Sequence, residues 1–286
     1  MNYSLGDPIP IGKVVSDGVD YLTEHYATAF NAITAGVHFL IAGLKNGLLA
    51  IPPIAFIAVI GVLSIWLLGW RRKGAWGLGV FGVVGLLLVL NLGYWAALME
   101  TLALVLAAEI MVVIIGLPLG ILGGRSELAD RIMRPILDIM QTMPAFVYLV
   151  PAVIFFGLGL VPGVISTVIF ALPPLIRLTT LGIRQVPREL VEASNSFGAT
   201  WWQMLIKVQL PSALPSIMAG VNQSIMLGLS MVVIAAMIGA GGLGNVVLQG
   251  ITQLDVGKGF VGGLSVVIIA IILDRITQSF GQKRSK

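Results

Sequence analysis

The sequence has no cysteine, only two histidines and few charged residues. Without cysteine the chain has no disulfide framework, thiolate metal site or thiol nucleophile, and its redox compartment stays undetermined. His25 and His38 both lie in the first fifty residues, which leaves nothing to build a histidine metal site in the apolar remainder. Charged residues make up 10% of the 286 residues, whereas 57% are hydrophobic and the mean hydropathy is +1.00. This is more apolar surface than one water-soluble core can bury, and it predicts an integral membrane protein.

Apolar stretches long enough to cross the hydrocarbon layer as helices recur about seven times. The class of structure that we predict is therefore all-α, with about seven transmembrane helices. The spans are expected near 51–70, 75–95, 101–123, 143–160, 163–181, 214–240 and 259–279. An odd number of spans puts the termini on opposite sides. With the N-terminus outside, every Lys and Arg falls on the inner side except Lys13, Lys45 and Lys258, so the positive-inside rule predicts a cytoplasmic C-terminus.

The N-terminal segment differs in kind from these spans. Between residues 11 and 48 apolar side chains recur at helical spacing, whereas Asp17, Asp20 and Glu24 lie on the opposite face. This pattern favours an amphipathic helix in the outer membrane interface. We expect a packing scaffold, and a ligand-binding role is the alternative. The chain then divides into this scaffold (1–50), peripheral transmembrane helices (51–98), a core domain (99–280) and a tail (281–286).

A polar loop of about thirty residues separates the spans at 163–181 and 214–240. Pro187 is suited to the first position of a helix, where Glu189 and Glu192 favour the helix dipole. Gly198 can end that helix in the left-handed conformation. A second short helix is expected from 200 to 208, before Leu210-Pro211 returns the chain to the membrane. Residues 187–213 thus form a helix-turn-helix that projects into the cytoplasm and docks on a partner, unless it folds back on its own membrane domain.

The spacing of this loop resembles the EAA signature of ABC-importer permeases. Three residues separate Glu192-Ala193-Ser194 from Gly198, and nine more precede Val208-Gln209-Leu210-Pro211. Ser194 replaces the second alanine of the signature and Val208 its isoleucine. The resemblance implies that the loop is a coupling helix seated in a cleft of an ATPase subunit. The residues to which it assigns this role are Glu192, Ala193, Ser194, Gly198, Val208, Leu210 and Pro211.

The stretches 137–159, 171–187 and 222–244 are similar to the ProW type of glycine betaine/proline betaine permeases. This resemblance implies a type I ABC importer permease in a bacterial or archaeal cytoplasmic membrane. It also implies a second permease copy in a homodimer, two ATPase subunits that bind ATP and Mg²⁺, and an external substrate-binding protein. No cofactor, metal or catalytic residue is expected in this chain, and no nucleic-acid partner. Choline, carnitine or another methylated amine is the alternative substrate, and an ion-gradient-driven carrier is the alternative class.

Two further features concern the spans. Glu109 is the carboxylate farthest from the ends of its span, and it is either a functional acid or a hydrogen-bonded structural residue. Prolines break several spans, and broken helices can line a pathway. The pathway candidates are Glu109, Met143, Pro144, Tyr148, Asn222, Gln223, Ser224 and Ser230.

Glycine-rich motifs in the spans predict packing and not catalysis. Residues 239–244 match the dinucleotide pattern G-x-G-x-x-G, but no strand precedes them, so we expect a flexible outer break. Small residues four apart let helices approach closely. They occur at Gly116, Gly120 and Gly124 and again at Gly220, Ser224 and Gly228.

Overall fold

The computed structural model describes residues 11–68 and 73–282, and within these ranges the chain is helical and contains no strand. The predicted all-α class is confirmed. Residues 1–10 of the expected scaffold, Arg71 and Arg72 of the charge count, and residues 283–286 of the expected tail lie outside the described residues.

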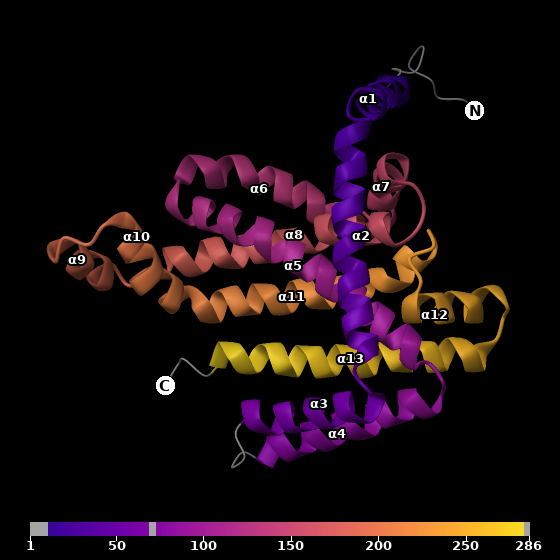
Figure 1. Ribbon diagram of the computed structural model, residues 1–286. Coiled ribbons are helices and arrows are strands. Elements are labelled where there is room, and N and C mark those ends of the chain that lie inside the picture. The colour runs from indigo at the N-terminus through magenta and orange to yellow at the C-terminus, as the bar shows by residue number, and fades with distance from the viewer. Residues whose placement is uncertain (1–10, 69–72, 283–286) are drawn as a thin grey trace, which may run out of the picture.

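Four long helices run side by side and form the body of the molecule (Figure 1). They are α5 (Trp95–Arg125), α8 (Leu160–Arg184), α11 (Leu210–Ala236) and α13 (Val256–Gln282). Their apolar side chains are spread around the helix axes, as is typical of helices surrounded by protein and lipid. α5 is shared between two buried clusters. Leu98 and Met99 pack toward Ile269 of α13, whereas Ala108 and Val112 pack toward Leu175 of α8.

The small-residue faces predicted from the sequence are packing faces. A Cβ atom on Gly120 would lie 2.5 Å from the Cβ of Thr179 on α8, and one on Gly124 would lie 2.8 Å from the Cβ of Ile183. On α11, a Cβ on Gly220 would lie 3.0 Å from the Cα of Leu175. α8 is therefore held between α5 and α11 at distances that only glycine permits.

Five helices are long and apolar enough to cross a membrane, and a bent pair could provide a sixth among the described residues. The first two predicted spans correspond to the shorter apolar helices α3 (Pro53–Leu68) and α4 (Lys73–Asn91), which pair and pack along α13. The predicted span 143–160 is not a straight helix. Instead α6 (Glu127–Thr142) meets the η1 turn (Ala145–Tyr148) and α7 (Leu149–Phe156) at 108°.

Local sequence explains this bend. Proline disfavours helical geometry in the residue before it, and Met143, which precedes Pro144, is extended with ψ 135°. Gly157 then ends α7 with a positive φ of 77°. The bent pair still carries the chain from the end of α5 toward the start of α8 (Figure 1).

The predicted N-terminal helix is divided into α1 (Ile11–His25) and α2 (Ala27–Ala50), with the break at Tyr26. α2 lies across the long helices and not alongside them (Figure 1), although its length and composition would also suit a span. It buries Val37 and Ile41 in the same cluster as Val112 of α5. A crosswise, one-sided contact is consistent with a scaffold helix, and its place in the membrane interface stays a prediction.

Candidate functional site

The loop that carries the sequence signature forms the hairpin of α9 (Arg188–Ser196) and α10 (Trp201–Met204) at the tip of the molecule (Figure 1). Pro187 precedes the first helical residue and does not occupy it, one position from the expectation. Gly198 has φ +71°. Its N–H donates to the carbonyl of Asn195 at 2.9 Å, and the N–H of Ala199 donates to that of Ser194 at 3.1 Å. Gly198 therefore ends α9 as predicted.

The start of α10 is fixed by a capping box that sequence reasoning missed. The Gln203 N–H donates to the Thr200 hydroxyl at 3.4 Å, and the Thr200 N–H donates to the Gln203 side chain at 2.8 Å. Thr-Trp-Trp-Gln has the spacing of this motif, so the signal was present in the sequence. Both ends of the turn between α9 and α10 are thus fixed by local bonds.

The expected end of the second helix before Leu210 is wrong. α10 continues through the π-helical segment η2 (Leu205–Gln209) into α11 without a break. Proline in a helix removes one hydrogen bond and its ring crowds the carbonyl four residues earlier. The wider π turn just before Pro211 accommodates both effects. The hairpin is consequently joined to the membrane helix α11 by a continuous helix.

The seven signature residues lie in two places. Glu192 and Ala193 are exposed on α9, with Ser194 half-buried, and Gly198 is exposed in the turn. Val208 and Leu210 are half-buried at the base of α11, where Pro211 is exposed. The first half of the signature thus shapes the tip, and the second half shapes its attachment.

The tip presents a large apolar side chain to its surroundings. Phe197 is 91% exposed, and Leu190 and Trp202 of the same hairpin are also exposed. Leu205, farther along the continuous helix, is buried. An apolar tip on a polar hairpin is suited to docking on a partner.

A second connection joins the hairpin to the bundle. The guanidinium carbon of Arg125, the last residue of α5, lies 4.0 Å from the centroid of the Trp201 ring. This is cation–π geometry. The hairpin therefore contacts α5 as well as continuing into α11, a link that the sequence spacing did not reveal.

The structure brings together two of the pathway candidates. Both carboxylate oxygens of Glu109 on α5 lie 2.8 Å from the hydroxyl oxygen of Ser224 on α11. Both residues are buried. This contact joins α5 to α11 inside the bundle, and a pathway role for the pair stays a prediction.

The other candidates are not gathered in one site. Asn222 faces α13, where its amide donates to Asp274 at 2.8 Å and its carbonyl accepts from Thr277 at 2.6 Å. Gln223 and Ser230 are exposed on α11. Three candidates lie at the bend after α6: Met143, Pro144, and Tyr148, whose hydroxyl donates to the Met140 carbonyl.

At the opposite end of α5 from the hairpin, the glycine-rich turn before α12 (Gly242–Thr252) is held in place. The Glu100 carboxylate accepts from the Gly242 N–H at 2.8 Å, and its other oxygen lies 2.5 Å from the Lys45 ammonium of α2. The Thr101 hydroxyl accepts from the Leu243 N–H at 2.8 Å. The expected flexible break is therefore a defined turn, because these side chains cap the N-terminus of α12.

Replacing Glu100 with alanine is expected to loosen this turn, since it removes the acceptor of the Gly242 N–H and the partner of Lys45. Loss of a hydrogen bond to a charged group costs about 1.5–3 kcal/mol, and we expect the low end because both side chains are partly exposed. Hydrogen exchange followed by mass spectrometry should show faster exchange in the peptide that contains Gly242. Unchanged exchange there would show that Thr101 suffices.

The fold with its projecting hairpin has a solved counterpart in an ABC transporter. The chain is similar in structure to a subunit of the MetNI methionine ABC transporter in an inward-facing conformation. That likeness has a TM-score of 0.61 and 23% identity, and covers 68% of this chain and 96% of the other.

Sequence comparison gives the family. The chain is 52% identical to the glycine betaine/proline betaine transport system permease protein ProW of Escherichia coli, over 96% of this chain and 76% of that protein. It is 51% identical to the glycine betaine/carnitine transport permease protein GbuB of Listeria monocytogenes, over 96% of both chains. The profile of the binding-protein-dependent transport system inner membrane components matches residues 116–286. The chain belongs to this family, and it is a multi-pass membrane permease.

Proposed function

We propose that this chain is the permease subunit of an ATP-driven importer for glycine betaine, proline betaine and similar quaternary ammonium compounds. The observation that carries the proposal is the similarity to betaine permeases along nearly the whole chain. The exposed hairpin supports the ATP-driven class, because it offers a docking element at one end of the bundle (Figure 1).

In this proposal ATP and Mg²⁺ are bound by two copies of a separate ATPase, and the permease does no covalent chemistry. The ATPase pair receives the α9–α10 hairpins of two permease copies in a homodimer. Movement of the hairpin reaches α11 through the continuous helix at η2 and α5 through Arg125 and Trp201. Because α5 also caps α12 at its far end through Glu100, one continuous helix connects the hairpin to the other end of the molecule.

The proposed orientation puts the hairpin and the C-terminus in the cytoplasm and the α12 turn outside. There an external binding protein delivers the substrate. The charge distribution of the loops supports this orientation. ATP binding closes the ATPase pair, and this closure shifts the permease between inward-facing and outward-facing states, as alternating access requires.

Uptake into proteoliposomes tests the proposal. The chain, reconstituted with its ATPase and binding protein, should accumulate labelled glycine betaine only when ATP is enclosed with the ATPase. Carnitine is the competitor to include, because one relative is named for it. Uptake that persists without ATP and collapses when ion gradients are dissipated would support a gradient-driven carrier and overturn the proposal.

A further inference from the structure

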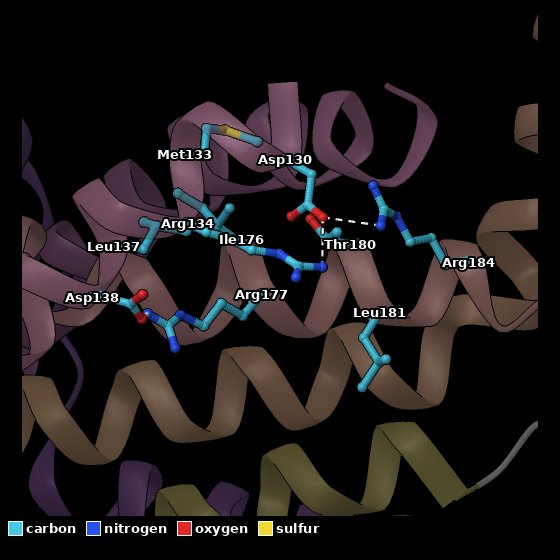
Figure 2. Close-up of a pocket in the computed structure, with 10 residues that line it drawn as sticks. All are labelled: Asp130, Met133, Arg134, Leu137, Asp138, Ile176, Arg177, Thr180, Leu181 and Arg184. Carbon is cyan, nitrogen blue, oxygen red and sulfur yellow. Dashed lines mark hydrogen bonds and ion pairs between the residues drawn. The ribbon is translucent and has the colours of Figure 1, made fainter. Parts of the chain in front are cut away.

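A cleft with charged walls lies between α6 and α8, apart from the hairpin and from the predicted pathway candidates. Its volume is about 370 Å³, which is within the range of small-molecule sites. Figure 2 shows its charged side chains arranged in two groups along the helices. Asp130 lies with Arg134 and Arg184 nearer the hairpin, and Asp138 lies with Arg177 deeper along α8.

The first group is built as a structural anchor. The Asp130 carboxylate, only 12% exposed, accepts from Arg184 at 2.9 Å and from Arg134 at 2.7 Å. Arg184 also donates to the carbonyl of Gly123 at 2.8 Å. With two cations on one buried carboxylate and a backbone bond in addition, this group ties α6 and α5 to α8.

The second group is a single, open ion pair. Arg177 donates to Asp138 at 2.5 Å, and neither side chain makes another side-chain hydrogen bond or ion pair among the described residues. Asp138 also attracts Arg134, which lies one turn earlier on α6. Their side chains are 39% and 65% exposed, respectively. An exposed pair of this kind contributes little to stability, so both charges can exchange partners at small cost.

The depth of this pair calls for an explanation beyond packing. Arg177 lies seven residues before Arg184, the last residue of α8, which is about 10 Å along the helix axis. Charged side chains within a membrane span are tolerated where they face a water-filled cavity, and there they can mark a route for charged solutes. Here one charge of each sign faces the same cleft.

The cleft walls around the ion pair are apolar. Leu137 and Met133 of α6 and Ile176 of α8 line the cleft together with the two charges. A quaternary ammonium group cannot donate a hydrogen bond, so it needs apolar contacts for its methyl groups and an anion nearby. A carboxylate needs a fork of N–H donors, which arginine provides.

We infer that the cleft at Asp138 and Arg177 is a transient binding site of the permease for a zwitterion that carries a quaternary ammonium and a carboxylate. This assignment rests on the proposed function, because betaines have this pair of charges. The ligand's carboxylate takes Arg177 and its ammonium takes Asp138, so that the ion pair between α6 and α8 is exchanged for two contacts with the substrate. α6 is then joined to α8 through the ligand, while the Asp130 group keeps the helices together.

Charge-neutral variants test the site in the reconstituted complex with its ATPase and binding protein. Arg177→Gln and Asp138→Asn should each lower glycine betaine uptake by ~10-fold or more, because the first removes a charge-assisted hydrogen bond to the carboxylate and the second removes the negative charge that attracts the quaternary ammonium. ATP hydrolysis stimulated by loaded binding protein should stay within about twofold of the parent, because the hairpin is untouched. Arg275→Gln, at an exposed arginine of α13 outside the cleft, is the matched control and should leave uptake unchanged.

The double variant Asp138→Asn/Arg177→Gln separates binding from packing. If the pair only fastens α6 to α8, removing both charges leaves none unpaired, and uptake should recover toward the parent value. If the pair binds substrate, glycine betaine uptake by the double variant should be no higher than uptake by the more impaired of the two single variants. Recovery in the double variant, or unchanged uptake in Arg177→Gln, would overturn the assignment.

Ligand binding can also be measured directly on the unaltered full chain. In lipid nanodiscs, saturation-transfer NMR should detect glycine betaine through its methyl protons, and choline, which lacks the carboxylate, should give a signal at least ~10-fold weaker. Equal signals from glycine betaine and choline would contradict a site that binds both the ammonium and the carboxylate of its ligand. Failure of the parent complex to take up betaine would instead overturn the proposed function, so the two failures are distinguishable.

Discussion

Replacing Gly198 with valine is expected to separate the permease from its ATPase and to lower uptake by ~10-fold or more. Gly198 has φ +71°, a conformation that costs an L-residue about 1–2 kcal/mol and a β-branched residue more. The turn between α9 and α10 would then shift, and Phe197 at the tip with it. The measurement is the amount of ATPase that co-purifies with the tagged chain, together with ATP-dependent uptake.

Two companion variants show whether backbone geometry is the cause. Gly198→Asn should lie between the parent and the valine variant, because asparagine tolerates the left-handed conformation better than other L-residues. Gly43→Val should have no effect on ATPase binding, since Gly43 lies within α2 and no atom lies within 4 Å of a Cβ added there. Full co-purification of the ATPase with Gly198→Val would count against a docking role for the hairpin.

Gly120→Val is expected to have the largest effect on folding. The new Cβ would lie 2.5 Å from the Cβ of Thr179 and 3.0 Å from the carbonyl oxygen of Ile176, so α5 and α8 cannot keep their separation. Overpacking of this kind costs about 1–3 kcal/mol and sometimes more, and here the obstacle includes the backbone. Size-exclusion chromatography of detergent extracts should show little monodisperse protein, with a lower melting temperature for the remainder.

The control for this variant is Gly263→Val on α13, where no atom lies within 4 Å of an added Cβ. Its yield and melting temperature should match those of the parent. If Gly120→Val behaves like the control, the close contact between α5 and α8 is not what holds the bundle together.

The hairpin was largely predictable because its signals are local. Proline before α9 and glycine after it act through the conformation of single residues, and both lie within one position of where the sequence placed them. The capping box at Thr200 was equally local and was overlooked. The similarity to ABC-importer permeases, first inferred from the spacing of Glu192 and Gly198, was confirmed by the family match.

Features that depend on the whole bundle were not predictable in the same way. Pro211 suggested a helix end, but the π turn at η2 absorbs the proline and the helix continues. A break in the span at 143–160 was expected from its prolines, but the sequence did not indicate that the chain would turn by 108° there. Local sequence records the presence of proline, whereas the path of the chain around it depends on neighbouring helices.

Contacts between distant residues were beyond sequence reasoning for a related reason. Glu100 and Gly242 are 142 positions apart, and Asp138 and Arg177 are 39 apart. Which side chains meet depends on the register of one helix against another, and the composition of each helix does not specify that register. Asn222 illustrates the consequence, because its bond to Asp274 of α13 could not be read from the sequence of either helix.

The central claim is that the α9–α10 hairpin docks on a separate ATPase, and cross-linking tests it most directly. The chain has no cysteine, so Phe197→Cys introduces one thiol at the tip of the hairpin. Val256→Cys is the control, because Val256 is also exposed and is the first residue of α13, which begins beside α12 at the opposite end of the bundle (Figure 1). With a thiol-to-amine cross-linker in the assembled complex, we predict an ATPase adduct from position 197 and none from position 256. An ATPase adduct from position 256, or none from position 197, would contradict the account.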